Sequence, residues 1–424
     1  MKKFEMKPSP KRLFPILIAG LCWGLFASAA RAQEGKPLPS LAEPDWTAFS
    51  EADAEALAEQ VKLLRFLGEI TPEREYQDSA EKKKLRDKLV AAYRDLKDNR
   101  AATLAAVMQE LPRAEEDFYS LTLARLLLRE LGDDAAPYLA WTLSHLRDPN
   151  ENFNLVFDVA FSLSKLNRRD CLPGLFPVLK IKNAKYRIPR YDWKISARYC
   201  LYYVFGAYGP GVCPYLVPAL SDENPYVRRN AAFLLGHFTY FPAQARLKAM
   251  LEDEDVGSAG AAEALGKMLC REAAEPIAAL LQSPSKHIRY WAASALYELE
   301  DKATLPALTA AEAAESDTET EDMMEMAIDA INWDRPPYWR RGRVIPRFKL
   351  KKILDEAEKN NGLEIELRDI GEIVASARPE DLPQLERIRE KAISSVSVES
   401  NRKLRIWNEL IRSVRLRLHR QGRI

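Results

Sequence analysis

The chain has 424 residues and a formal net charge of +1, with 47% hydrophobic and 29% charged residues. This composition is typical of a soluble helical protein, and the near-zero net charge excludes a strong overall field for nucleic acid or a membrane surface. Five cysteines in this length do not make a disulfide scaffold.

Residues 1–32 are predicted to be a secretory signal. A basic start is followed by an apolar run from Leu13 to Ala30, and Ala30-Arg31-Ala32 supplies the small residues that a signal peptidase reads. Cleavage is expected before Gln33, which predicts a periplasmic or extracellular protein. An uncleaved membrane anchor is the alternative, although the run is at the short end for spanning a bilayer.

The segment after the predicted cleavage site, residues 33–50, is rich in proline and polar residues. It is expected to be a flexible lead-in. Residues 52–70 and 79–96 have helical patterns and are placed to cap the helices that come after them in the chain.

One short apolar phrase occurs five times. Pro137–Leu143, Pro173–Leu179 and Pro214–Leu220 match well, and Pro276–Leu281 and Pro306–Ala311 are looser copies. The first residues are 36, 41, 62 and 30 positions apart, and 62 is close to two steps of the same length. A fixed period of this size is typical of a solenoid, whose units bury their apolar faces only by stacking.

A second pattern follows each phrase. Its clearest copy runs from Asp222 to Gly236, and it recurs at Asp253–Gly266 and Ser283–Leu296. Apolar residues at three- and four-residue steps predict amphipathic helices, and their alanine pairs allow close helix contacts. Proline suits the first turn of the phrase helix, and Asp or Ser before the second helix can accept its free N–H groups.

The pattern Asp-x-x-x-x-Val-Arg-x-x-Ala-Ala-x-x-Leu-Gly at 222–236 resembles HEAT repeats, especially the bacterial type grouped with phycobilisome lyase subunits. The resemblance covers roughly residues 85–332. It implies an all-α, right-handed α-solenoid of stacked helix-turn-helix units over residues 51–332. Members of this family are mostly scaffolds and binding surfaces, so the resemblance implies a non-catalytic binding role. It also implies that Arg228 and Arg289 bridge the turns between units.

Two segments combine basic and aromatic residues. Lys180–Trp193 lengthens one unit, and Trp333–Phe348 interrupts the repeat pattern with three prolines. Insertions in a solenoid often form the binding face, and aromatic and arginine side chains are favoured interface anchors. The candidate binding residues are Tyr186, Arg187, Arg190, Tyr191, Trp193, Tyr338, Trp339, Arg340 and Arg341. The alternative is that these rings fill gaps between irregular units.

Residues 333–348 are interpreted as a linker, and residues 349–424 as a basic helical region that is either a cap or a set of degenerate repeats. Helices are predicted at Leu350–Lys359, Ile365–Ala377, Leu382–Ser394 and Glu399–Arg420. Residues 221–334 carry 21 acidic and 9 basic groups, whereas residues 335–424 carry 13 acidic and 22 basic groups. This asymmetry predicts either partner binding or closure of one end on the other.

No sequence pattern supports catalysis. The four histidines, at 145, 237, 287 and 419, form no metal-ligand spacing, and the chain has no Gly-rich phosphate loop and no nucleophile elbow. Cys171, Cys200, Cys213 and Cys270 are expected to be mainly buried thiols, with one disulfide as the alternative. No cofactor and no metal are predicted.

The best hypothesis is therefore an exported scaffold that binds another protein or peptide through its solenoid surface. Binding of an acidic glycan or cell-envelope polymer by the two basic–aromatic segments is the alternative, and an unrecognised enzyme is the third hypothesis. Nucleic acid is not an expected partner, and no transmembrane span is expected after signal cleavage.

Overall fold

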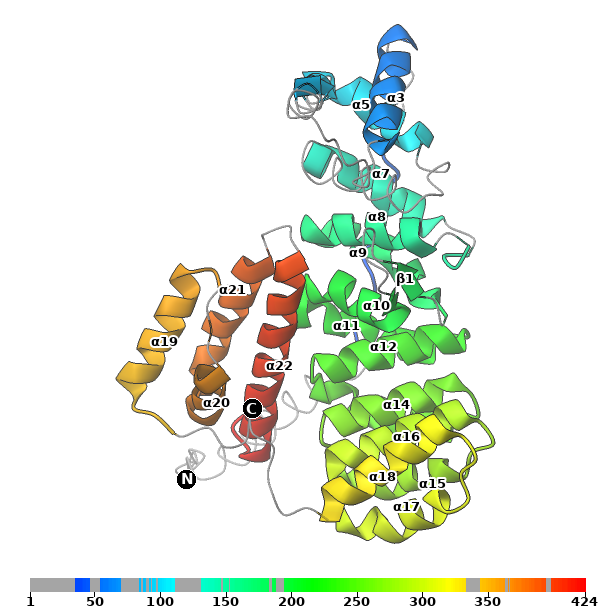
Figure 1. Ribbon diagram of the computed structural model, residues 1–424, viewed down its shortest axis with the longest axis vertical. Coiled ribbons are helices and arrows are strands. Elements are labelled where there is room, and N and C mark those ends of the chain that lie inside the picture. Colours follow the sequence, from blue (N-terminus) through cyan, green and yellow to red (C-terminus); the bar gives the residue numbers. More distant parts are fainter. Residues whose placement is uncertain are drawn as a thin grey trace, which may run out of the picture.

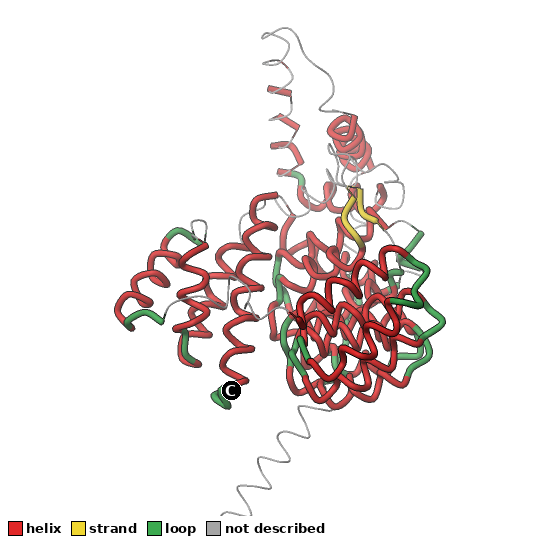
Figure 2. Tube along the Cα trace, turned by 60° about the horizontal axis from the view of Figure 1, so that its bottom comes forward, coloured by secondary structure: helices red, strands yellow, loops and turns green. Residues whose placement is uncertain are grey.

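The computed structural model describes residues 35–45, 54–69, 84–110, 131–332 and 344–424, with gaps at 85–86, 89–90, 93, 97, 146–147, 152, 183–184, 188–193, 363–364, 366 and 394–397. The described part is a stack of helices with one short two-stranded sheet (Figures 1 and 2). The prediction of an all-α solenoid is confirmed. The signal predicted at residues 1–32 lies outside the described residues.

The solenoid has two layers, and the longer helices form one of them. In Figure 1 these helices are stacked in chain order down the picture, each in contact with the next. This long-helix layer consists of α8 (Phe153–Lys165), α10 (Ala197–Gly206), α12 (Pro225–His237), α14 (Val256–Lys267), α16 (Lys286–Leu299) and α18 (Thr318–Asn332).

The repeated apolar phrases form the other layer, the short-helix layer. Most of its members are one or two turns of α-helix continued as a 3₁₀ helix. They are α7 (Gly132–Ser144), α9 and η5 (Leu172–Lys180), α11 (Cys213–Leu216) and η7 (Pro218–Ser221), α13 (Gln244–Ala249) and η9 (Met250–Glu252), α15 (Ala274–Ala279) and η11 (Leu280–Gln282), and α17 (Leu305–Glu312).

Short 3₁₀ turns connect each long helix to the next short one: η4 (Arg169–Cys171), η6 (Gly209–Val212), η8 (Phe241–Ala243), η10 (Arg271–Ala273) and η12 (Lys302–Thr304). Before the stack, α3 (Ala54–Glu69) packs on α5 (Arg100–Glu110), and the described residues from 84 to 96 are helical. Among the described residues, no helix is both long and apolar enough to cross a membrane.

Small residues set the close spacing within each layer. A Cβ atom on Gly236 would lie 2.6 Å from Ala264 Cα, and one on Gly266 would lie 2.7 Å from Ala295 Cα. The same contact joins Gly174 of α9 to Ala140 of α7 in the short-helix layer. Backbone therefore meets backbone at successive units, as the repeated glycines and alanine pairs predict.

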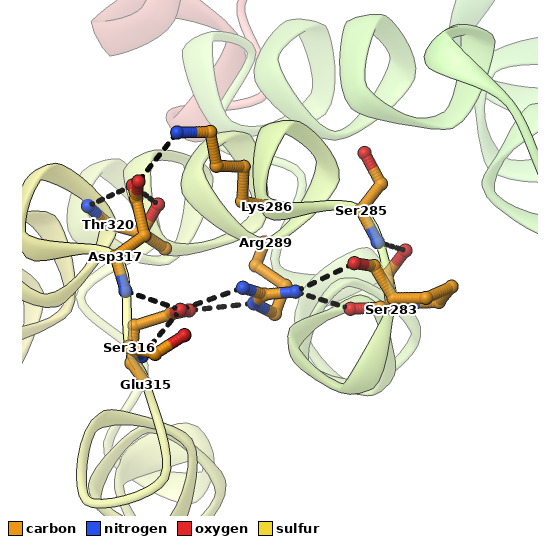
Figure 3. A network of polar contacts seen from close by, with 9 residues as sticks. Ser283, Ser285, Lys286, Arg289, Glu315, Ser316, Asp317 and Thr320 are labelled. Atoms are coloured by element: carbon orange, nitrogen blue, oxygen red, sulfur yellow. Dashed lines mark hydrogen bonds and ion pairs between the residues drawn. The ribbon is translucent and has the colours of Figure 1, made fainter.

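A ladder of arginines joins the turns on one edge of the stack. Arg289 makes two 2.7 Å hydrogen bonds to the Glu315 carboxylate of the next turn and donates to the carbonyl oxygen of Ser283 at 2.9 Å (Figure 3). Arg228 makes the matching contacts two units earlier, 3.1 Å to Asp253 and 2.5 Å to Asp255. These arginines bridge turns, so they form a structural ladder.

Apolar burial divides the described chain into two large clusters, besides a small one at Ala207. One runs continuously between the two layers from Val61 to Ile331, and the other lies among the last four helices, from Leu350 to Leu418. All four described cysteines are free thiols buried in the first cluster. Burial raises the pKa of the Cys171 thiol to about 11, which keeps it protonated and unreactive at neutral pH.

The C-terminal region forms a compact unit beside the solenoid. It consists of α19 (Arg347–Lys359), α20 (Leu367–Ser376), η14 (Pro379–Asp381), α21 (Leu382–Ile393) and α22 (Val398–Arg420). These helices agree closely with the four predicted from the sequence. Both views show the unit folded back along the stack, with α22 nearest to it (Figures 1 and 2).

Arginines of this unit hold the C-terminal ends of successive long helices. Arg389 donates to the carbonyl oxygen of Gly206 at 2.8 Å, Arg415 to that of Phe238 at 3.0 Å, and Arg412 to that of Lys267 at 2.7 Å. Helix C-termini have free carbonyl groups and partial negative charge, which guanidinium groups satisfy. The basic C-terminal region thus packs on the solenoid of its own chain.

Residues 35–45 also pack on the solenoid. This segment belongs to the predicted flexible lead-in of residues 33–50, and its backbone is extended. Leu38 and Leu41 pack against the main apolar cluster.

Candidate binding surface

One strand lies in the insertion predicted at Lys180–Trp193 and a second follows it directly, and the sequence indicated neither. β1 (Lys185–Arg187) pairs antiparallel with β2 (Lys194–Ser196), with Tyr186 opposite Ile195. Three residues per strand are too few for an alternating pattern to be recognised. The hairpin packs on α8 and α10, beside the long-helix layer (yellow in Figure 2).

Most of the predicted binding residues lie outside the described part of the chain. Of the first segment, the backbone of Tyr186 and Arg187 lies in β1, but their side chains are not described. Those outside the described residues are Arg190, Tyr191, Trp193, Tyr338, Trp339, Arg340 and Arg341. Their role as a binding surface stays a prediction.

Next to the hairpin, an arginine lies between two aromatic rings. Arg198 is the second residue of α10, two residues after β2 ends. Its guanidinium carbon lies 4.4 Å from the ring centroid of Phe233 on α12 and 4.0 Å from that of Trp291 on α16. It also forms an ion pair with Glu263 of α14. Four successive long helices therefore meet at this one side chain.

Further rings extend this contact in both directions across the long-helix face. Trp291 contacts Tyr290 at 5.2 Å and His287 at 6.3 Å between ring centroids. Phe233 contacts His237 at 4.3 Å, and His237 contacts Tyr202 at 4.9 Å. The arginine–aromatic row is defined as Tyr202, His237, Phe233, Arg198, Trp291, Tyr290 and His287.

The close approach of α12 and α14 shapes this face. A Cβ atom on Gly260 would lie 2.8 Å from the Arg229 backbone, so α14 has no room for a side chain there. Arg229 is only 1% exposed, and its guanidinium carbon lies 5.1 Å from the Tyr226 ring. Lys182, three residues before the hairpin, also lies over the Tyr226 ring, with its ammonium nitrogen 5.8 Å from the ring centroid.

Burial and positive charge determine the protonation of the row. Burial, followed by the charges of Arg229 and Arg198, lowers the pKa of His287 to about 4. His287 is therefore neutral at neutral pH. Burial also lowers the pKa of Arg198, and Arg229 lowers it further, while the Tyr199 and Tyr290 hydroxyls act in the opposite direction. Arg198 stays charged beside Glu263 because a guanidinium has a very high intrinsic pKa.

Exposed aromatic side chains border the row. Tyr199 follows Arg198 on α10 and is 42% exposed, and Tyr297, seven residues after Tyr290 on α16, is 39% exposed. At the opposite end, Asn408 of α22 contacts Tyr202. Arg198 in the middle of the row therefore lies next to the hairpin, and Tyr202 at one end lies against the C-terminal unit.

This arrangement suits binding through the exposed tyrosines, because Tyr202 and Phe233 of the row are themselves buried, at 3% and 4% exposed. Arginine and large aromatic residues dominate the energetics of protein interfaces, because they present broad apolar area together with directed hydrogen-bond donors. In the described part of the chain, no group of histidine, cysteine and carboxylate side chains is arranged to hold a metal ion.

Family models match the same helices. A model of the HEAT repeat matches residues 212–241, and a model of HEAT repeats matches residues 256–329. The chain contains HEAT repeats. The likeness to the phycobilisome-lyase type stays a prediction.

Comparison with whole proteins adds little to the HEAT-repeat assignment. One similar solved structure is the crystal structure of the Escherichia coli protein YibA, whose sequence is 17% identical to this chain. The match covers 66% of this chain and 98% of the YibA chain, with a TM-score of 0.32. No curated protein matches the chain. The functional interpretation of the HEAT-repeat surface therefore depends on its own geometry.

The arginine–aromatic row was not found from the sequence. Its three central members, Arg198, Phe233 and Trp291, are 35 or more residues apart, and each occupies an ordinary position in a helical repeat. Phe233 is only 4% exposed and belongs to the main apolar cluster, so the sequence carries no separate signal that marks these residues as a group. Only the stacking of the HEAT repeats brings them together.

Proposed function

We propose that this protein is an exported HEAT-repeat scaffold that binds another protein or peptide on its long-helix face and catalyses no reaction. The observation that carries the proposal is Arg198, held between Phe233 and Trp291 at the centre of the arginine–aromatic row. A rigid set of rings with accessible tyrosines beside it loses little conformational freedom when a partner binds. The predicted basic–aromatic insertion adjoins the same face.

A pull-down from an envelope extract of the source organism, with the purified protein as bait, tests this proposal. Once a partner is identified, Tyr199→Ala combined with Tyr297→Ala is expected to weaken its binding at least tenfold, about 1.4 kcal/mol. Both side chains are partly exposed, so the melting temperature should change little.

Phe348→Ala is the matched control, because Phe348 is an aromatic residue of α19 that is 77% exposed and lies outside the long-helix layer. Partner binding that is insensitive to the tyrosine pair, or lost equally in the control, would exclude the long-helix face as the binding site.

Export is proposed from the basic, apolar and small-residue regions of residues 1–32. The mass of the exported protein is expected to correspond to a chain that begins at Gln33. Recovery of the full-length chain in the membrane fraction would instead support the uncleaved anchor.

One observation favours the alternative of an acidic polymer as ligand. A cavity of about 250 Å³ in the C-terminal unit is lined by Arg347, Arg378, Arg417 and Arg423 together with Ser376. Arg347 and Arg378 are paired with Glu380, at 3.9 and 3.7 Å, and Arg347 also pairs with Asp381. Arg417 donates to the carbonyl oxygen of Val374 at 2.6 Å and to that of Ala377, and Arg423 is close enough to add to burial in lowering the pKa of Arg417. Neighbouring guanidinium groups attract sulfate, phosphate or carboxylate groups.

Dextran sulfate is a suitable probe for this alternative. Binding that falls steeply as salt rises, and that weakens at least tenfold in Arg378→Ala with Arg423→Ala, would support the polymer. Absence of binding at low salt would exclude it.

A further inference from the structure

An extended segment of the chain, residues 35–45, crosses the short-helix layer. At one end, the backbone N–H of Lys36 donates to the carbonyl oxygen of Pro214 at 2.7 Å. At the other end, the Tyr138 hydroxyl donates to the carbonyl oxygen of Asp45 at 2.7 Å. The segment therefore runs from α11 back to α7, against the direction of the stack. In Figure 1 it is the thin blue trace behind the helices.

Every third residue of this segment faces the solenoid. Gly35, Leu38 and Leu41 are half-buried and Pro44 is buried, whereas all seven residues between and after them are exposed. Three residues per turn is the period of a polyproline II helix, which rises about 3.1 Å per residue. Eleven residues then span about 30 Å, enough to cross three packed helices about 8–10 Å apart.

The first position fits closely. The φ angle of Gly35 is +78°, and a Cβ atom there would lie 2.6 Å from Pro218 Cδ and 2.8 Å from the Pro214 carbonyl oxygen. Only glycine fits such a position. The face therefore accommodates a defined pattern, Gly-x-x-Leu-x-x-Leu-x-x-Pro, with the intervening side chains in solvent.

The segment is tethered to the solenoid by the chain itself. Its contacts with the solenoid include a hydrogen bond near each end and the packing of the inward-facing residues. A tethered segment needs little intrinsic affinity, because the tether gives it a high effective concentration. A free peptide of higher affinity can displace it.

We propose that the short-helix face from α7 to α11 is a second peptide-binding surface. Its partner is an extended, polyproline-II-like segment of another protein with an apolar side chain at every third position. Residues 35–45 are the intramolecular occupant that this partner displaces. Extended proline-rich segments are recognised in this way because they are already ordered before they bind. The proposal is independent of binding on the long-helix face.

The test uses the full chain with two pairs of substitutions. Leu38→Asp with Leu41→Asp places charge at inward positions and releases the segment. Pro39→Asp with Ser40→Asp places the same charge at exposed positions and is the control. The probe is a fluorescein-labelled synthetic peptide with the sequence of residues 35–45. Its fluorescence anisotropy should show binding to the first variant at least tenfold tighter than to the control or the wild-type protein.

A second probe peptide tests whether the fit is specific. With valine in place of Gly35, the peptide should bind the released variant at least tenfold more weakly. Equal affinity of the two peptides, or equal binding of the first peptide to all three proteins, would overturn the proposal.

The wild-type protein provides a measurement that does not depend on how the variants fold. Elastase cuts after alanine, and an excess of unlabelled peptide that carries glutamate in place of the exposed Ala42, and so is not itself cut there, should speed cleavage of the protein after Ala42 by exposing the segment. An unchanged cleavage rate at saturating peptide would count against displacement. A wild-type dimer with exchanged segments, detected by light scattering, would assign the face to a second copy and overturn its assignment to a partner.

Discussion

Substitution of Gly266 by alanine tests how the HEAT repeats are spaced. The added Cβ atom would lie 2.7 Å from Ala295 Cα, 2.9 Å from its Cβ and 3.0 Å from its carbonyl oxygen. All three distances are below the ordinary carbon contact distance of about 3.5–4.0 Å. Two of these atoms belong to the backbone. A side-chain rotation therefore cannot relieve the contact, and α14 and α16 must move apart. Overpacking of this kind costs about 1–3 kcal/mol.

Alanine also favours the helix over glycine, by at most about 1 kcal/mol at this near-terminal position. The free energy of unfolding, measured in urea by circular dichroism, should therefore fall by about 1–2 kcal/mol. Gly211→Ala is the control, because the nearest atom to its added Cβ is the flexible end of Arg169, at 3.1 Å. A Gly266→Ala protein as stable as the wild type, with an unchanged control, would refute backbone contact as the basis of the spacing.

Three further predictions concern charged groups. Arg289→Ala removes the hydrogen bonds that hold the pKa of Glu315 at about 2. The pKa of Glu315 should therefore rise toward its ordinary value in an NMR titration, and the free energy of unfolding should fall by about 2 kcal/mol. His287, whose pKa burial lowers to about 4, stabilises the fold fully above pH 6.5 and loses that contribution as the pH falls toward 4, so His287→Gln should reduce the loss of melting temperature between pH 7 and 5. Arg412→Ala removes the bond to Lys267 and should speed hydrogen exchange of α22 amides by at least tenfold, with little change in α14.

The regular part of the fold follows from the sequence because each unit is specified locally. The 62-residue interval between two phrases predicted a hidden unit, and α13 with η9 occupies it. That unit has Arg246 at the position that corresponds to Pro276 thirty residues later, so the proline pattern missed it. The helix caps are polar side chains, as expected, but they lie two residues after Asp222 and Asp253, where the patterns begin. Asn224 accepts a hydrogen bond from the N–H of Tyr226, and Asp255 accepts one from the N–H of Gly257.

The tertiary contacts outside the repeat could not be predicted in the same way. The charge asymmetry between residues 221–334 and 335–424 left partner binding and self-closure equally open. The structure shows that arginines of α21 and α22 mainly bind backbone carbonyl groups at helix ends. Every residue has a backbone carbonyl group, so the sequence does not show which helix ends these arginines will bind. The arginine–aromatic row is hidden for a related reason, because its members come from three different helices, α10, α12 and α16.

The C-terminal unit also determines how rigid the long-helix face is. Arg415 and Arg412 are three residues apart on α22, about 4.5 Å along its axis, yet they bind the ends of α12 and α14, and Arg412 also lies 3.6 Å from Glu298 of α16. One straight helix thus holds three successive units whose axes are about 8–10 Å apart, and the long arginine side chains spread to cover the difference. Units held in this way cannot slide or bend independently. Since Arg198, Phe233, Glu263 and Trp291 belong to four neighbouring units, their mutual geometry is fixed before any partner arrives, which lowers the entropy lost on binding at this surface.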